Sequence, residues 1–209
     1  MLFVNHHQRG EKEGYSTVSS EEEGGHYRQP SINNPPALHC VRLMKIYQGM
    51  PLWQRTSDVL ALRGFSASIE EGQIFCLLGH NGAGKTTTVN ILTGLFEPTF
   101  GDGFIYGHSV VAEMETIRRF MGVCPQHDIL WNDLTAREHL EIFAELKNVP
   151  SYERAAVVDD KLRSVNLYDV GNKLVGGFSG GMKRRLSVAM SCIGEPKIIF
   201  MDGELAVLL

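Results

Sequence analysis

The residues best suited to chemistry lie between positions 79 and 87, where the chain reads Gly-His-Asn-Gly-Ala-Gly-Lys-Thr-Thr. A glycine, four residues and then Gly-Lys-Ser/Thr is the pattern of a phosphate-binding P-loop. Glycines let the backbone wrap closely around an anion, and successive N–H groups then point at its oxygens. We predict that Lys85 reaches the β- and γ-phosphates of a nucleotide and that the Thr86 hydroxyl binds magnesium. The predicted nucleotide contacts are Gly79, Asn81, Gly82, Ala83, Gly84, Lys85, Thr86 and Thr87.

The segments on either side of this loop distinguish a nucleotide site from a plain glycine-rich turn. Residues 73–78 are apolar and strand-like, and residues 86–95 suit a helix. The N-terminus of such a helix carries a partial positive charge that favours phosphate. A dinucleotide-binding fingerprint is disfavoured because its third glycine would fall at Thr87.

The composition is that of an ordinary globular protein, with 43% hydrophobic and 21% charged residues. A net charge of −4 does not support a nucleic-acid-binding surface, which is normally basic. The four cysteines are scattered without a Cys-x-x-Cys pair, which favours buried, reduced thiols in the cytosol. No apolar run approaches the roughly 20 residues needed to cross a bilayer, so the sequence as written predicts a soluble chain.

The chain divides by composition near residue 37. Residues 1–36 are rich in Gly, Ser, Glu, Asn and Pro and are predicted to be a disordered tail or linker. After them, strand-like and helix-like patterns alternate, which predicts an α/β fold with a largely parallel sheet. We predict strands at 38–47, 59–69, 104–106, 121–124 and 197–202. Helices are predicted at 110–120, after a capping box at 135–138, around 155–165 and from about 182.

The last predicted strand ends in a carboxylate. Residues 197–202 form an apolar run without alternation, as in a parallel strand that is buried on both faces. Ligands of such sheets lie at the carboxyl ends of the strands. We therefore predict that Asp202 holds the magnesium ion, directly or through water.

Four motifs follow one another in a set order: the loop at 79–87, Gln126 just after a strand, Phe-Ser-Gly-Gly-Met at 178–182, and the run that ends at Asp202. Together they resemble the nucleotide-binding domain of an ATP-binding-cassette (ABC) transporter. The detail Gly-Val-Cys-Pro-Gln-His at 122–127 resembles subfamily A, whose members are mostly lipid exporters. The resemblance implies a P-loop NTPase of ABC type, with a mainly parallel core sheet, an antiparallel β subdomain and an α-helical subdomain at about 127–180. The domain would occupy residues 37–209.

The resemblance also implies roles for single residues. Tyr47 would stack on adenine, although a strand-end tyrosine can equally pack locally. Gln126 would contact magnesium or the attacking water; otherwise it is a surface glutamine of a loop. Ser179, Gly180 and Gly181 would bind the γ-phosphate of a nucleotide held by a second cassette, and Ser179 can at the same time cap its own helix.

A basic run follows this signature at 183–185 and is predicted to be a solvated helix face rather than a nucleic-acid patch. The resemblance stops at Asp202. In the family a glutamate that polarises the attacking water follows directly, whereas here Gly203 follows and Glu204 comes one position late. A shift of one residue at a strand end turns the side chain to the other face, which weakens Glu204 as a catalytic candidate. None of the eight histidines follows Asp202, so the family's switch histidine has no counterpart. We expect a C-terminally truncated domain, incomplete after the strand of the Walker B motif.

The sequence therefore favours an ATP-binding and ATP-hydrolysing part of an ABC transporter that moves lipids, with ATP and Mg²⁺ as ligands. Its expected partners are transmembrane domains, a second nucleotide-binding domain and a lipid-like substrate, without nucleic acid. It would lie at the cytoplasmic face of a membrane, or in the cytosol if the chain exists alone. One alternative is nucleotide binding without turnover, because the catalytic glutamate and histidine are missing. Another is a soluble ABC ATPase that acts on ribosomes or DNA, which the acidic balance disfavours.

Overall fold

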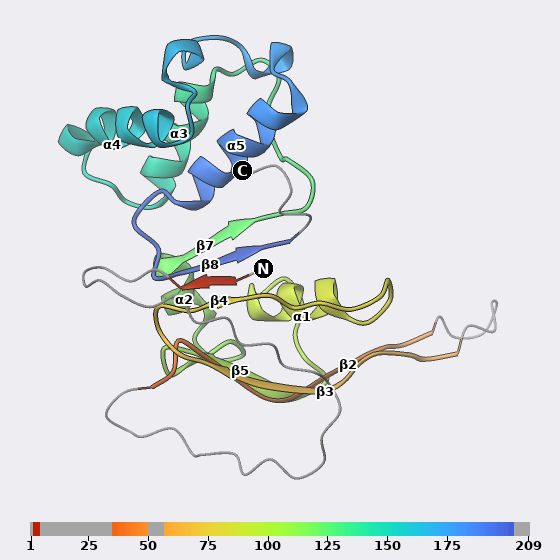
Figure 1. Cartoon of the computed structure of the whole chain (residues 1–209). Coiled ribbons are helices and arrows are strands. Elements are labelled where there is room, and N and C mark those ends of the chain that lie inside the picture. The colour runs from red at the N-terminus through yellow and green to blue at the C-terminus, as the bar shows by residue number, and fades with distance from the viewer. Residues whose placement is uncertain (1, 5–34, 50–56, 203–209) are drawn as a thin grey trace. The chain divides into compact units, whose positions relative to one another are not determined.

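The computed structural model describes residues 2–4, 35–49 and 57–202 (Figure 1). The chain divides into two compact units, residues 2–118 and residues 119–209. Each unit combines strands with helices, and each is described by itself below. Among the residues that the structure describes, none of the helices is both long and apolar enough to span a membrane.

An antiparallel sheet makes up much of the 2–118 unit, with its strands in the order β3-β2-β5-β6 (Figure 1). The strands are β2 (Leu38–Tyr47), β3 (Val59–Ile69), β5 (Phe100–Ile105) and β6 (His108–Ser109). The strands predicted at 38–47 and 59–69 are confirmed with the same bounds. Leu38, Leu43, Leu62 and Ile69 are each buried in the core of this unit, and the register shifts between β2 and β3 allow residues at odd and even positions to face the same core.

Strand β5 is longer than the predicted strand at 104–106. Gly101, Asp102 and Gly103 suggested a turn, but Asp102 and Gly103 pair with Val41 and Cys40 of β2. Glycine serves close packing here, because a Cβ on Gly103 would lie 2.8 Å from the Leu92 side chain. The helix that contains Leu92 can therefore lie directly against the strand.

The short ladder in front of the glycine-rich loop also differs from the prediction. Strand β4 covers only Ile74–Phe75 of the predicted 73–78, and it pairs antiparallel with β1 (Leu2–Val4). The predicted tail of 1–36 thus includes three residues, 2–4, that the structure gives as a strand. Residues 5–34 of the predicted tail lie outside the described residues. Helix α1 (Lys85–Leu92) belongs to this unit, and α2 (Met114–Phe120) extends two residues beyond its boundary; both helices are shorter than predicted.

The 119–209 unit contains the parallel strands that the sequence predicts. Strand β7 (Met121–Cys124) pairs in parallel with β8 (Ile198–Met201), and all four residues of β8 are buried. This burial accounts for the apolar run without alternation. The helices of the unit are α3 (Ala136–Leu146), α4 (Ser151–Ser164) and α5 (Gly180–Ser191), and between α4 and α5 lie the short 3₁₀ turns η1 (Tyr168–Val170) and η2 (Val175–Gly177). Their buried side chains form one cluster around Leu140, Leu162 and Leu186.

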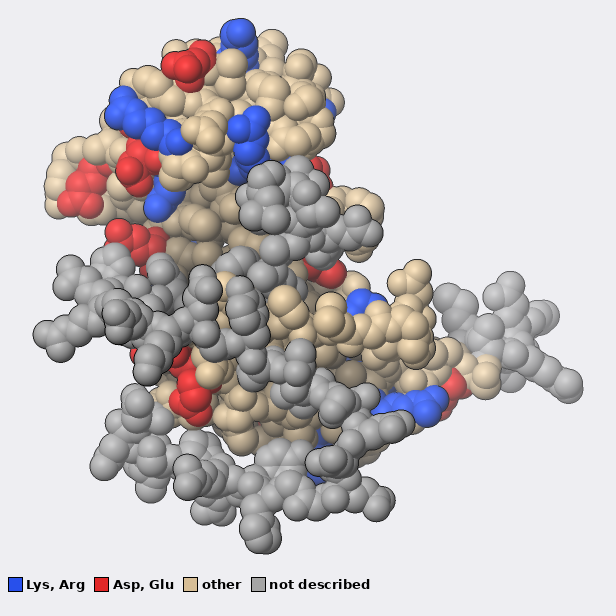
Figure 2. Space-filling model, viewed as in Figure 1, with Lys and Arg blue, Asp and Glu red and all other residues tan. Residues whose placement is uncertain are grey.

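The predicted capping box begins helix α3. The Thr135 hydroxyl accepts from the Glu138 N–H at 3.2 Å, and the Glu138 carboxylate accepts from the Thr135 N–H at 2.7 Å. The Thr135 N–H and the Thr135 hydroxyl, which also donates to the Glu138 carboxylate at 2.8 Å, lower the pKa of Glu138 because both bonds stabilise its ionised form. Both signs of charge are interspersed over the helices of this unit (Figure 2), and the ion pair between Arg137 and Asp159 joins α3 to α4 at 2.7 Å.

Candidate nucleotide-binding site

The glycine-rich loop leads directly into helix α1, which begins at Lys85 with Gly84 as its N-cap. The Ala83 N–H donates to the His80 carbonyl at 3.1 Å, and the Thr88 N–H makes the first helical bond to the Gly84 carbonyl at 2.8 Å. The residues from Gly79 to Ala83 are exposed, and the first turn of α1 contains no acidic residue. The loop therefore presents a helix N-terminus to solvent without a carboxylate that would repel an anion.

Gly84 is required where it stands for two reasons. Its φ is +89°, a left-handed conformation that disfavours other residues, and a Cβ there would lie 2.6 Å from the Ala61 carbonyl oxygen. Ala61 is the extra residue of a β-bulge, since Lys45 pairs with Leu62 whereas Ile46 pairs with Leu60. The bulged strand thus supports the loop at the start of α1.

Lys85 folds back over the loop. Its ammonium donates to the carbonyls of Gly79 at 2.6 Å and of His80 at 2.9 Å. These bonds hold the cation at the mouth of the loop, which is where a P-loop lysine is needed for the β- and γ-phosphates.

Tyr47 ends strand β2 with 36% of its surface exposed. Its ring meets the ring of Phe96 edge to face, with centroids 6.1 Å apart and planes at 86°. The Lys45 ammonium lies 5.5 Å from the centre of the Tyr47 ring and 5.9 Å from that of Phe96, and it donates to the Glu97 carbonyl at 2.6 Å. Tyr47 is therefore packed against neighbouring side chains and also partly open to solvent. The local packing fits a structural role, and the open part leaves room for stacking on adenine.

The other predicted site residues belong to the 119–209 unit. Gln126 is exposed two residues after β7, and Asp202 is half-buried directly after β8. The Asp202 N–H donates to the Cys124 carbonyl at 3.0 Å, so the two strand ends lie side by side. Each of Gln126 and Asp202 follows a strand, as the sequence predicts, and the structure shows that these two strands are adjacent. Glu204 lies outside the described residues.

Ser179 is the N-cap of helix α5, and its hydroxyl accepts from the Met182 N–H at 3.3 Å. Ser179 and Gly180 are exposed, and Gly181 is half-buried. A Cβ on Gly180 would meet none of the described residues within 4 Å, so the packing of that part of the chain does not require glycine there. The cap is present, and it leaves the helix N-terminus accessible to a ligand from outside the chain.

The donors available for a metal fit magnesium. The Thr86 hydroxyl in one unit and the Asp202 carboxylate in the other are each oxygen donors, the kind of ligand that magnesium prefers. No group of three or more His, Cys, Asp or Glu side chains that could hold a metal occurs within the described ranges.

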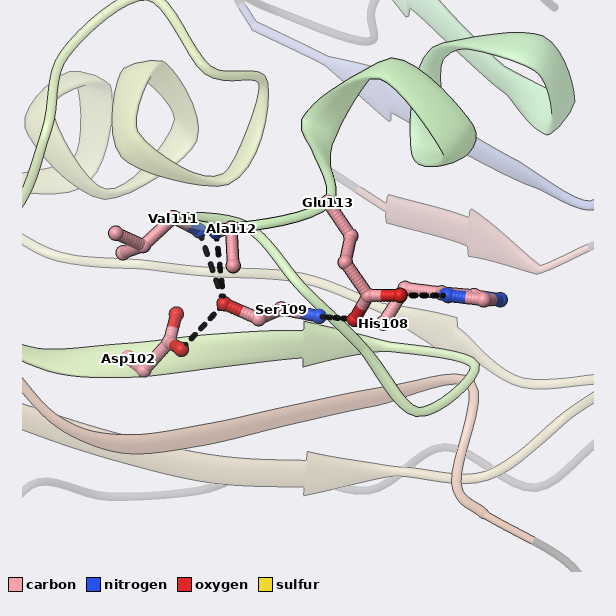
Figure 3. Close-up of polar contacts among 6 residues, drawn as sticks. All are labelled: Asp102, His108, Ser109, Val111, Ala112 and Glu113. Atoms are coloured by element: carbon pink, nitrogen blue, oxygen red, sulfur yellow. Dashed lines mark hydrogen bonds and ion pairs between the residues drawn. The ribbon is translucent and has the colours of Figure 1, made fainter.

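A second polar cluster joins β5, β6 and the segment before α2 (Figure 3). The Ser109 hydroxyl donates to the Asp102 carboxylate at 2.6 Å and accepts from the N–H groups of Val111 and Ala112. Glu113 bonds His108 at 2.9 Å and the Ser109 N–H at 3.0 Å, which lowers the pKa of its carboxyl. Serine, histidine and carboxylates are the residue types of a hydrolase, but the serine proton goes to an aspartate and the hydroxyl caps a turn. This cluster stabilises the turn.

Three further side chains next to the predicted residues were not identified from sequence. Lys45 and Phe96 contact Tyr47, and Arg184 bonds the backbone beside Gln126 and Asp202. Only the contact between Lys45 and Tyr47 could have been predicted from the sequence, because residues two apart on a strand lie on the same face. Arg184 also corrects the prediction of a solvated basic face at 183–185, because its side chain is only 12% exposed.

The chain belongs to the ABC transporter family, whose family model matches residues 62–206. The relatives it matches include proteins named as members of the A family of ABC transporters. It is 50% identical over 170 residues to "ABC transporter A family member 1" of Dictyostelium discoideum, a match that covers 81% of this chain and 19% of the relative. It is 51% identical over 184 residues to "ABC transporter A family member 2" of Arabidopsis thaliana, covering 85% of this chain and 19% of the relative. The chain thus spans about a fifth of the length of these relatives.

Solved structures agree with the fold. An ATP-binding subunit of an ABC transporter matches with a TM-score of 0.64 and 27% identity, over 77% of this chain and 63% of that one. A dimeric ATP-binding cassette in a post-hydrolysis state with ADP and Pi matches with a TM-score of 0.70 and 24% identity, over 81% of this chain and 77% of the other. The predicted α/β fold of the ABC type is thereby confirmed.

Proposed function

We propose that this chain is the nucleotide-binding part of a subfamily A transporter, which binds and hydrolyses ATP to move a lipid through a membrane partner. The observation that carries the proposal is the junction of loop and helix at Gly84 and Lys85. There an exposed helix N-terminus and a lysine ammonium meet at one loop. The family membership supports the nucleotide, whereas the lipid substrate rests on the resemblance to subfamily A alone.

In the proposed mechanism the loop N–H groups and Lys85 bind the phosphates, and Tyr47 stacks on the adenine. Thr86 and Asp202 would hold a magnesium ion, which would supply positive charge to neutralise the phosphate oxygens. The Gln126 amide orients the attacking water, because an amide can accept from water and donate to phosphate at once. The reaction is an in-line displacement at the γ-phosphate, with catalysis by positioning and charge stabilisation.

A second nucleotide-binding domain is the proposed partner of the α5 N-terminus. Ser179, Gly180 and Gly181 would approach the γ-phosphate that the second domain holds. The open space above Gly180 supports this assignment, since a glycine without a role in its own fold leaves room for a ligand.

Transmembrane domains are the other proposed partner, and the loop after Gln126 offers a surface for them. Ile129 and Trp131 are 68% and 50% exposed. The Trp131 N–H donates to Nε2 of the buried His139 at 2.9 Å, and Nδ1 of the same ring bonds the Thr135 carbonyl at 2.7 Å. Because a carbonyl only accepts, the proton lies on Nδ1 and the neutral ring fixes the loop. Apolar side chains held in this way suit a docking surface.

Nucleotide binding without turnover is the second candidate. Its support is Gly203, which stands where the family has its catalytic glutamate. In this case the chain would bind ATP through the same loop and release no phosphate.

Lysine replacement tests the proposal. We expect Lys85→Ala to weaken ATP binding about 10- to 150-fold, since a charge-assisted hydrogen bond contributes roughly 1.5–3 kcal/mol. Binding of a fluorescent ATP analogue to the 209-residue chain measures this effect, with Lys173→Ala, an exposed lysine in the other unit, as the matched control. Equal affinity of the Lys85→Ala variant and the parent would refute the proposal. Phosphate release by the parent separates the two candidates, because release supports hydrolysis and binding without release supports the second candidate.

A further inference from the structure

Arg184 of helix α5 has a fixed and largely buried side chain. Its Nη1 donates to the Pro125 carbonyl at 2.5 Å, and its Nη2 donates to the Asp202 carbonyl at 3.2 Å. The guanidinium also lies 3.6 Å from an Asp128 carboxylate oxygen. With only 12% of this side chain exposed, such partners are needed to offset the loss of hydration.

The two carbonyls belong to neighbouring strand ends. Cys124 pairs with Met201, and each carbonyl belongs to the residue that directly follows one of these two. The planar guanidinium carries donors that point in different directions, so one arginine can bridge both strand ends at once. A lysine has a single nitrogen on a flexible stem and cannot reproduce this fork.

Each residue held in this way adjoins or is a proposed magnesium ligand. Pro125 directly precedes Gln126, and Asp202 itself carries the proposed metal carboxylate. Arg184 also lies one helical turn after Gly180, where the exposed N-terminus of α5 begins. The Arg184 side chain therefore connects its own helix to two strand ends, which lie 18 and 59 residues away from Arg184 along the chain.

We propose that Arg184 is a positioning residue, which fixes Gln126 and Asp202 relative to the N-terminus of α5 without touching the nucleotide. This inference rests on the proposed function, because it assigns Arg184 to the same magnesium site. Its consequence is specific: loss of the fork impairs the metal-dependent part of ATP binding and leaves the metal-free part intact. Arg184 thus acts on the metal as the hydrogen-bonded partners of metal ligands do.

The chain offers a matched control in the next residue. Arg185 donates to the Val165 and Asn166 carbonyls at 3.1 and 3.4 Å, so it also bonds two carbonyls, but these follow helix α4. Arg185→Met removes a comparable pair of hydrogen bonds from the same helix. Any effect that is shared by Arg184→Met and Arg185→Met reflects the stability of the helices alone.

The test measures ATP affinity of the 209-residue chain in EDTA and again with saturating Mg²⁺. The ratio of the two dissociation constants is the magnesium gain. We expect Arg184→Met to reduce this gain about tenfold, the low end for loss of a partner of a metal ligand, with unchanged affinity in EDTA. The magnesium gain of Arg184→Lys should be closer to that of Arg184→Met than to that of the parent. Arg185→Met should have the same gain as the parent. Binding of Mn²⁺ to the ATP complex, followed by electron paramagnetic resonance, should weaken in the same order.

An unchanged magnesium gain in Arg184→Met, or equal losses in Arg184→Met and Arg185→Met, would overturn the inference. If Arg184→Met does not fold, Arg184→Lys decides, since a parental gain in that variant shows that charge alone suffices. Failure of the proposed function gives a different result. In that case Asp202→Asn retains the full magnesium gain, or the parent chain shows none, whatever happens at Arg184.

Discussion

Replacing Tyr47 by alanine should weaken ATP binding without affecting the binding of inorganic tripolyphosphate. Tyr47 pairs with Val59, which is two residues along β3 from Ala61, whose carbonyl lies against Gly84. Two strand residues span about 7 Å, so the ring lies near enough to the loop for one nucleotide to reach both. Stacking of a base on an aromatic side chain contributes about 1–3 kcal/mol, which corresponds to a loss of about 5- to 150-fold in ATP affinity.

The assay is a competition experiment in which ATP and tripolyphosphate each displace a fluorescent ATP analogue from the chain. Tyr47→Phe should retain most of the ATP affinity, because it keeps the ring. Phe100→Ala removes another exposed aromatic side chain of the same sheet and should leave the affinities for ATP and for tripolyphosphate unchanged. Equal losses for ATP and tripolyphosphate in Tyr47→Ala, or no loss for either, would refute the stacking role. Phe96→Ala should weaken ATP alone by a smaller factor, because an edge-to-face contact contributes only about 0.5–1.5 kcal/mol.

The remaining predictions concern stability and reactivity. Thr135→Ala should lower the free energy of unfolding by about 1 kcal/mol in urea titrations, because it removes an N-cap. Since the pKa of Glu138 is lowered in the folded chain, its contribution is present at neutral pH and is lost as the pH falls through that pKa; a difference between parent and variant that stays constant down to pH 3 would contradict this. Leu140→Ala should lower the free energy of unfolding by about 2–5 kcal/mol, because Leu140 is fully buried in the helical core. A decrease below about 1 kcal/mol would contradict the burial of Leu140 in that core. The exposed Cys76 should react with a maleimide in the native chain, whereas Cys40, whose pKa burial raises to about 12, should react only after denaturation; mass spectrometry of labelled peptides distinguishes the two.

Local patterns were enough to predict the elements whose periodicity and ends agree. The strands at 38–47 and 59–69 alternate, and the capping box at Thr135 contains both of its partners within four residues. The strand before Asp202 was predictable because burial on both faces leaves only apolar residues. In each case the physical cause lies within the segment itself.

Contacts between distant segments were not predictable in this way. Gly103 suggested a turn, but its small size serves the packing of Leu92, eleven residues earlier. Residues 2–4 were assigned to a tail because their partner, β4, lies some seventy residues away along the chain. Arg184 was assigned to a solvated face because nothing near it in sequence reveals that two carbonyls approach its side chain.

Two glycines of the predicted site differ in whether the fold of this chain requires them. Gly84 is explained within the chain, since its φ of +89° and the Ala61 carbonyl both exclude a side chain. Gly180 lacks both causes: its φ is not positive, and a Cβ there would contact none of the residues that the structure describes. Glycine disfavours a helix relative to alanine by up to about 1 kcal/mol, so the fold alone gives no reason for it. A ligand that approaches the N-terminus of α5 from outside does supply a reason, and it is the same reason that the proposed second nucleotide-binding domain requires.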